Sequence, residues 1–396
     1  MYKRQIEDDE LYRPLADFRV LTRPEFRAVL WDQWSLYEEG LAEPDEGELL
    51  DTRKYKGNKW GGKYLRAPDI FFTILRKGRG KLVYLGEIAE IETYLNTGGA
   101  DGFFIVKDVG GDDTIRLIRN VSREGQGCVF ELEAKFLRRF IKSPSEIRGI
   151  KILASDPQWV LVVLPTDERL LTERAQRYIR WGESVGFHQR SGCRNRHPWW
   201  RLPRQATAPA PCLFFRGYHD RLFSAWNPYR IAYTRAYGVW FIIDERLGVA
   251  MLNTTFATLE REMLGRTSLG QGALDFQGVD IPQVQLIDPS CLIPHQDTML
   301  STFESLANRP IRSIFEELGF ELCHESRKAC QHPEHPYEYV RPEDLTLEQV
   351  RRASPDRFEL DAVVFDVLGL TDKERLEVYR AVVQLVKDRL MKARSV

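Results

Sequence analysis

The sequence has 396 residues, of which 43% are hydrophobic and 29% are charged, and its formal net charge is −1. This composition is typical of a soluble globular protein with one large core or two to three smaller ones. No apolar run reaches the roughly 18 residues that a transmembrane helix needs, and residues 1–10 are charged where a signal peptide would be apolar. We therefore expect no membrane partner and a cytoplasmic location, which also fits six cysteines without a framework spacing.

Residues 1–65 hold weak elements without a core of their own. Residues 18–21 favour a short strand, and residues 23–37 favour an amphipathic helix carrying Trp34 and Tyr37. The stretch 51–63 is rich in Gly and Lys, as exposed linkers are. We expect a tail or connector over residues 1–65, followed by a domain that begins near residue 66.

Residues 66–294 alternate between short β-rich runs and helices, the pattern of a mixed α/β domain. Helices are expected over 134–141, 168–182 and 255–264. Strands are expected over 82–88, 103–106, 114–119, 159–164, 213–216, 239–243 and 249–252. Residues 295–396 are expected to be helical, with capping boxes at Thr346–Gln349 and Thr371–Glu374. The predicted fold is mixed α+β: an α/β domain with a mixed sheet and flanking helices, followed by a helical C-terminal region.

The segment from Arg174 to Arg230 is unusually basic. It contains eleven arginines, no lysine and only two acids, so its formal charge is +9, and four tryptophans are interleaved. Arginine binds phosphates and reads guanine, and indoles stack on bases, so the segment predicts a nucleic-acid-binding surface. The alternative is a solvated helix face followed by a Pro-rich loop whose tryptophans pack into the core.

Two glycine-rich stretches have a plain and a functional interpretation. Residues 96–104 form either a turn between strands or a nest of backbone amides beside a phosphate. Residues 265–274 form either a helix C-cap with its loop or a phosphate contact. Asn227-Pro228-Tyr229 resembles the Asn-Pro-Pro-Tyr motif of methyltransferases but lacks one proline, and we interpret it as a turn.

Two patterns could hold a metal. Cys323, His324, Cys330, His332 and His335 offer zinc ligands, but their spacing matches no standard finger, so a variable surface loop is favoured.

Glu131, Glu133 and Lys135, with Asp112 and Asp113 upstream, could form the acid plus Glu-x-Lys pattern of metal-dependent nucleases. Glu-Leu-Glu-Ala-Lys is also ordinary amphipathic helix sequence, whereas that chemistry places the Glu-x-Lys pair on a strand.

Several blocks in succession resemble the C-terminal half of adenine-N6 DNA methyltransferases of restriction-modification type. They are residues 60–69, 96–104, 142–147, the Arg174–Arg230 segment, 252–255, 265–274, 356–361 and 368–371. The resemblance implies a prokaryotic target-recognition domain that holds double-stranded DNA against a catalytic domain, where an adenine is flipped out and methylated from S-adenosylmethionine. It implies no cofactor and no catalytic residue in this chain, because the cofactor loop and the complete Asn-Pro-Pro-Tyr motif are missing.

The resemblance therefore predicts a truncated fragment, inactive by itself, whose catalytic domain acts in cis or in trans. The boundaries expected are 1–65 for the connector, 66–294 for target recognition and 295–396 for the helical region. Residues expected to contact phosphates or bases, or to stack beside the displaced base, are Lys142, Arg190, Arg194, Arg196, Trp199, Trp200, Arg216, Tyr218, Arg221, Arg266 and Thr267. The alternatives are a separate DNA-binding specificity subunit and a metal-dependent nuclease.

Overall fold

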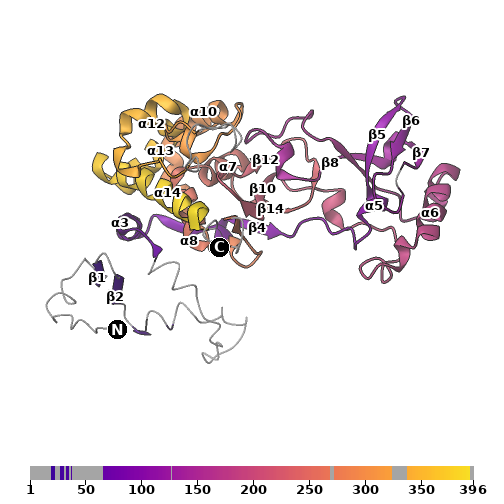
Figure 1. The fold of residues 1–396 in the computed structure, drawn as a ribbon, viewed down its shortest axis with the longest axis horizontal. Helices are drawn as coiled ribbons and strands as arrows, with labels where there is room; N and C mark the ends of the chain where they lie inside the picture. The colour runs from indigo at the N-terminus through magenta and orange to yellow at the C-terminus, as the bar shows by residue number, and fades with distance from the viewer. Residues whose placement is uncertain are drawn as a thin grey trace.

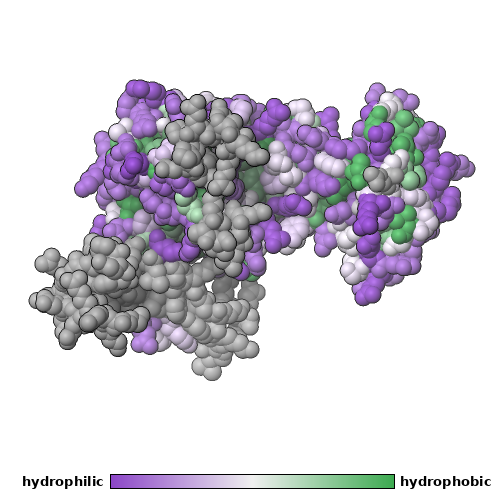
Figure 2. Space-filling model, viewed as in Figure 1, coloured by the Kyte–Doolittle hydropathy of each residue, from purple (hydrophilic) through white to green (hydrophobic). Residues whose placement is uncertain are grey.

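The computed structural model describes residues 19–22, 27–30, 33, 34, 37, 66–125, 127–267, 272–322 and 337–392. From residue 66 onward, the described chain forms an elongated molecule with two lobes (Figure 1 and Figure 2). One lobe gathers the C-terminal helices, and the other carries an antiparallel sheet with helix α6 beside it. The predicted mixed α/β fold is confirmed.

Each lobe has its own hydrophobic core. The helical lobe is built on a cluster to which residues 67–89, 141–152, 210–231 and 233–390 contribute. The sheet lobe is built on a smaller cluster from residues 95–140 and 161–206, together with Ala232. The backbone passes from one core to the other between Ile231 and Ala232, so the lobes meet there. The domain boundaries at residues 65 and 294 stay predictions.

Helices pack around the core of the helical lobe, and the side chains that cap them explain several of their ends. Thr254 accepts a hydrogen bond from the amide of Ala257, and one helix stops where Gly369 adopts a left-handed φ of 67°. The helices are α3 (Asp69–Lys77), α4 (Leu85–Ile88), α7 (Glu245–Leu252), α8 (Thr255–Leu264), α9 (Pro289–Leu292), α10 (Gln296–Ala307), α11 (Ile314–Glu317), α12 (Leu347–Ala353), α13 (Pro355–Leu368) and α14 (Asp372–Lys392).

Of the two predicted capping boxes, one forms completely and the other only in part. At the start of α14, Glu374 accepts from Thr371 and its amide donates back to the Thr371 hydroxyl, so this box is confirmed. At the start of α12, Thr346 caps the amide of Gln349, but the Gln349 side chain donates to the carbonyl of Gly319 instead. The second box is therefore only half formed.

Short sheets complete the helical lobe. An antiparallel sheet has the order β12 (Ala225–Trp226), β10 (Cys212–Phe215), β14 (Ala236–Phe241) and β4 (Ala89–Glu92). Smaller antiparallel sheets are β11 (Gly217–Tyr218), β16 (Leu274–Asp275) and β15 (Arg266–Thr267), and the pair β17 (Gln285–Ile287) and β3 (Leu82–Tyr84). Near the N-terminus, β1 (Arg19–Thr22) pairs with β2 (Arg27–Leu30).

The sheet lobe contains a six-stranded sheet. Its order is β13 (Ala232–Tyr233), β8 (Leu137–Ile141), β9 (Trp159–Val162), β5 (Ile105–Gly111), β6 (Ile115–Arg119) and β7 (Val129–Glu133). Only the β13–β8 pair is parallel, because β13 enters from the helical lobe. Helix α5 (Asp101–Phe104) precedes β5, and α6 (Glu173–Val185) packs against β7.

Five sequence-based assignments are wrong in whole or in part. The strand expected over 82–88 ends at Tyr84, and residues 85–88 form helix α4, whose start is capped by Glu87 accepting from the amide of Tyr84. Residues 249–252 belong to helix α7 rather than a strand, and residues 134–141 form a 3-10 turn and strand β8 rather than a helix. Residues 103–104 end helix α5 instead of starting a strand, and residues 27–30 form a strand where a helix was expected. The sequence of a short apolar run does not distinguish a helix from a strand. Residues 137–141 form strand β8 because they pair with β9 and β13. The zinc pattern at 323–335 lies outside the described residues.

Candidate nucleic-acid interface

Three of the four tryptophans in the Arg174–Arg230 segment pack within the sheet lobe, whereas Trp226 packs against the core of the helical lobe. The Trp199 ring lies 4.7 Å from that of Phe103, and its Nε1 donates to Glu183 at 3.1 Å. Trp200 is buried and donates to the carbonyl of Pro165 at 3.0 Å. Trp181 packs 4.7 Å from Phe130. For the tryptophans of the sheet lobe, the packing interpretation is therefore the one that the structure supports.

The glycine-rich stretch 96–104 serves the same packing. A Cβ on Gly192 would lie 2.5 Å from the Cα of Gly98, so the arginine loop and this turn touch through bare backbone. The amide of Gly98 donates to Asn96 Oδ1 at 2.7 Å, and the Cys193 thiol donates to the carbonyl of Thr97 at 3.4 Å. These contacts favour the turn over an amide nest for phosphate.

Most of the arginines named from the sequence have partners within the protein. Carboxylates neutralise three of them, in the pairs Arg190–Glu124 at 2.9 Å, Arg216–Asp275 at 3.2 Å and Arg266–Asp280 at 3.1 Å. Backbone carbonyls hold two others: Arg196 donates to Asn96 and Arg201, and Arg221 donates to Ile147, Arg148 and Ile311. Burial lowers the pKa of Arg221, as expected for a guanidinium used inside the fold.

A smaller set of arginines is exposed without a partner. In the described part of the chain, no side-chain hydrogen bond or ion pair involves Arg177, Arg180, Arg194 or Arg201. Arg177 and Arg180 lie one turn apart on α6, opposite its buried Tyr178. These four guanidinium groups keep their full charge toward solvent, which is what phosphate binding needs.

The remaining sequence candidates lie in different surroundings. The Nζ atom of Lys142 lies 4.1 Å from the centre of the Trp159 ring, and Nζ of Lys107 lies 3.8 Å from the same ring centre. Tyr218 is buried, its hydroxyl accepts from the amide of Phe215 at 3.0 Å, and burial raises its pKa. Thr267 is exposed on β15. Because Tyr218 and Trp200 are enclosed by the cores, neither ring can stack on a base without rearrangement.

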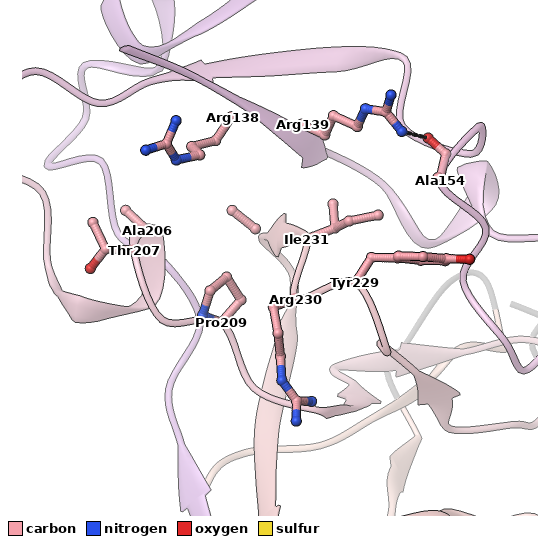
Figure 3. A pocket seen from close by; sticks show the side chains of 10 residues that line it. Arg138, Arg139, Ala154, Ala206, Thr207, Pro209, Tyr229, Arg230 and Ile231 are labelled. Carbon is pink, nitrogen blue, oxygen red and sulfur yellow. Dashed lines mark hydrogen bonds between the residues drawn. The ribbon is translucent and has the colours of Figure 1, made fainter. Parts of the chain in front are cut away.

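A cavity of about 370 Å³ lies where the two lobes meet (Figure 3). Its lining comes from β8, the turn around residue 207 and the segment that leads into β13: Arg138, Arg139, Ala154, Ala206, Thr207, Pro209, Tyr229, Arg230, Ile231 and Ala232. We call it the junction cavity. Tyr229, which follows the Asn-Pro pair of the sequence, is 57% exposed at its edge.

Charge in the junction cavity comes from β8. Arg138 donates to the carbonyls of Lys135 and Leu137 at 2.8 and 3.1 Å, and Arg139 donates to the carbonyl of Ala154. Within the described residues, neither guanidinium pairs with a carboxylate. The Arg230 guanidinium points away from them in Figure 3 and pairs with Glu245 at 2.7 Å. The cavity therefore presents two positive charges that no carboxylate of the described residues neutralises.

The two glutamates of the possible nuclease motif, Glu131 and Glu133, interact with Arg174. Glu131 and Glu133 do lie on a strand, β7, contrary to the expected helix. However, Arg174 bonds Glu131 at 3.1 Å and lies 3.7 Å from Glu133, while Thr172 donates to Glu133 at 2.9 Å. Among the described residues, no group of three or more His, Cys, Asp or Glu side chains is arranged to hold a metal ion. The contacts of both glutamates are those of an ion pair within the fold.

No helix of the described ranges combines the length and apolarity that crossing a bilayer requires.

Part of the chain matches the model of a known protein family. Residues 145–316 match the family described as "Type II methyltransferase M.Eco57I, C-terminal domain". The resemblance to the C-terminal region of restriction-modification methyltransferases is thereby confirmed. The matched residues include β9, α6 and β13 of the sheet lobe, and β10, β12, β14 and helices α7 to α10 of the helical lobe.

A solved structure shares the fold more widely. The type IIG restriction endonuclease BpuSI matches with a TM-score of 0.50 and 12% identity, over 86% of this chain and 35% of that chain. This chain thus spans about a third of the length of BpuSI. No curated protein sequence matches the chain.

Sequence reasoning missed the arginines of the junction cavity. Arg138 and Arg139 were assigned to a helix, and Tyr229 was set aside as part of a turn. The sequence offered one indication, the adjacent arginines Arg138 and Arg139 in an apolar run. Their meeting with residues 206–232 depends on the parallel pairing of β8 with β13.

Proposed function

We propose that this chain recognises DNA for a site-specific adenine-N6 methyltransferase of a restriction-modification system. The observation that carries the proposal is the pair of guanidinium groups in the junction cavity, Arg138 and Arg139, which have no carboxylate partner among the described residues. They belong to a chain whose residues 145–316 match a type II methyltransferase domain. Unneutralised guanidinium groups on a folded surface are the groups that bind phosphodiesters most readily.

In this proposal the duplex contacts both lobes. Arg138 and Arg139 bind the backbone at the junction, and Arg177, Arg180, Arg194 and Arg201 bind it along the sheet lobe. Lys107 and Lys142 add charge around Trp159. These contacts position the duplex, whereas sequence is read by side chains that reach base edges.

Methyl transfer itself is assigned to a catalytic domain in cis or in trans. That domain binds S-adenosylmethionine, and this chain needs no cofactor of its own. The proposal is supported by the likeness to BpuSI, of which this chain matches 35%. A separate specificity subunit, serving a catalytic domain encoded elsewhere, fits the same surface and differs only in how the two are linked.

Salt-dependent binding tests the DNA contacts. The affinity of the full chain for a labelled duplex is measured by fluorescence anisotropy over a range of KCl concentrations, for wild type and for an Arg138→Ala, Arg139→Ala double variant. Because each phosphate contact contributes about 0.9 to the slope of log affinity against log salt, the double variant should lower that slope by roughly 1.8.

Arg174→Ala is the matched control. Its guanidinium is exposed but neutralised by Glu131 at 3.1 Å, so its removal should leave the slope unchanged. Circular dichroism checks that each variant folds. The proposal fails if the wild-type chain does not bind duplex DNA at low salt, or if the double variant and wild type have equal slopes.

The adenine-N6 assignment is tested separately. The chain is combined with a catalytic domain and S-adenosylmethionine, and the methylated DNA is digested to nucleosides for mass spectrometry. N6-methyladenine is the expected product, and methylcytosine alone would refute the assignment.

A further inference from the structure

A second concave surface lies at the edge of the β10–β14–β4 sheet, away from the residues of the junction cavity. It encloses about 560 Å³, within the range of about 300–1,000 Å³ that is usual for small-molecule sites. We call it the tyrosine groove, and its lining is Ile91, Thr93, Tyr94, Arg216, Tyr237, Gln277, Gly278 and Val279. The proposed DNA contacts of the junction cavity use none of these residues.

Two tyrosine rings form the wall of the groove. Tyr94 and Tyr237 meet edge to face, with ring centroids 5.8 Å apart and planes at 73°. Tyr237 is 7% exposed, whereas Tyr94 is half-buried. The backbone of Gly278 lies against Tyr237, since a Cβ there would come within 3.4 Å of the ring. Because Gly278 has no side chain, nothing at this position extends into the groove beside Tyr237, and a planar ring can stack against the tyrosine wall.

Polar groups stand beside this aromatic wall. Gln277 is exposed, and its side-chain amide makes no hydrogen bond within the described part of the chain. Arg216 brings a guanidinium whose ion pair with Asp275, at 3.2 Å, leaves its side chain 48% exposed. An amide donates and accepts at once, as base edges require, whereas the charge of Arg216 is already balanced by Asp275.

The rim of the groove carries an unusually exposed apolar side chain. Val279 is 68% exposed and directly follows Gly278. Some DNA-binding proteins insert an exposed apolar side chain between base steps as a wedge. Val279 lies in the same groove as Tyr94 and Tyr237, so it can act as a wedge beside a base that stacks on the tyrosines.

We propose that the tyrosine groove binds one unpaired nucleotide of a DNA strand. Its base stacks on Tyr94 and its edge bonds Gln277. A paired base offers only its edge and cannot present a ring face to Tyr94, so the groove selects nucleotides that have left the helix. The inference rests on the proposed DNA recognition and adds a ligand for a site that the duplex contacts do not use.

The test compares two duplexes of the same sequence, one fully paired and one with a single bulged 2-aminopurine. Base stacking on an aromatic ring should make the full chain bind the bulged duplex about tenfold more tightly. Tyr94→Ala should abolish this preference without changing affinity for the paired duplex, and Tyr94→Phe should retain it. Gly278→Leu should also abolish it, because the new side chain fills the groove.

Ile293→Ala is the control for Val279→Ala, since both side chains are 68% exposed. Val279→Ala should weaken only bulged-duplex binding, and Ile293→Ala should change neither. Equal wild-type affinity for the two duplexes, or an undiminished preference in both Tyr94→Ala and Gly278→Leu, would overturn the inference while leaving the proposed function intact. No binding to either duplex would overturn both.

Discussion

A buried carboxylate in the helical lobe should control the stability of that lobe. Glu317 is 1% exposed and receives two hydrogen bonds from Arg309, at 2.8 and 2.7 Å, and one from Ser354 at 3.1 Å. It also faces Arg357, itself 1% exposed, at 3.3 Å. Replacing Glu317 by Gln removes the negative charge and leaves Arg357 buried without it. Breaking a buried pair from one side costs about 3–5 kcal/mol, which is the loss expected in the free energy of unfolding.

The loss should depend on pH. Burial by itself would raise the pKa of Glu317, but the hydrogen bonds of Arg309 and the charges of Arg357 and Arg309 outweigh it and hold the pKa well below its ordinary value. A depressed carboxylate pKa stabilises the fold above the unfolded value of about 4.3, and this contribution is lost as the pH falls through the folded pKa. The difference between wild type and Glu317→Gln should therefore shrink below about pH 4.

Urea denaturation, followed by fluorescence at neutral and acidic pH, measures this difference. Glu348→Gln is the control, because Glu348 is exposed and lies 3.9–4.0 Å from its arginine partners. Surface pairs of this kind contribute about 0–1 kcal/mol, so the control should unfold nearly as wild type does. The reasoning is refuted if Glu317→Gln loses less than about 1 kcal/mol at neutral pH, or if its loss is the same at both pH values.

Two neighbouring arginines should behave differently on replacement by Ala. Arg194→Ala should reduce the salt slope of DNA binding by about 0.9 without changing the melting temperature. Arg196→Ala should lower the melting temperature, because the carbonyls of Asn96 and Arg201 lose their donor, and equal melting of both variants would contradict this. The cysteines offer an independent check: Cys128 is exposed, whereas burial raises the pKa of the Cys212 thiol. Iodoacetamide should label Cys128 in the native protein and Cys212 only after denaturation; mass spectrometry that finds equal labelling rates would disprove the buried position.

Local sequence predicted the elements whose ends are marked by capping residues. The helix predicted over 255–264 is observed at those residues, where Thr254 caps its first turn, and the strand predicted over 114–119 is observed over 115–119. Residues 137–141 and 249–252 were misassigned because each is a short apolar run. Whether such a run forms a helix or a strand depends on the segments from elsewhere in the chain that pack or pair with it.

The basic segment was visible in the sequence, but the state of each arginine was not. The acids that neutralise Arg190 and Arg216 are Glu124 and Asp275, which lie 66 and 59 residues away. Whether a guanidinium is free depends on such distant partners. No count of charges along the chain can supply that information.

The sequence by itself thus determined the class of fold, the position of the basic segment and the resemblance to methyltransferase C-terminal regions. Only the tertiary structure decided that the tryptophans of the sheet lobe pack inside it, that Glu131 and Glu133 pair with Arg174, and that β8 carries two arginines to the junction cavity. The physical reason is that side-chain type is local information. Burial, pairing and the meeting of strands arise from contacts between segments far apart in the chain.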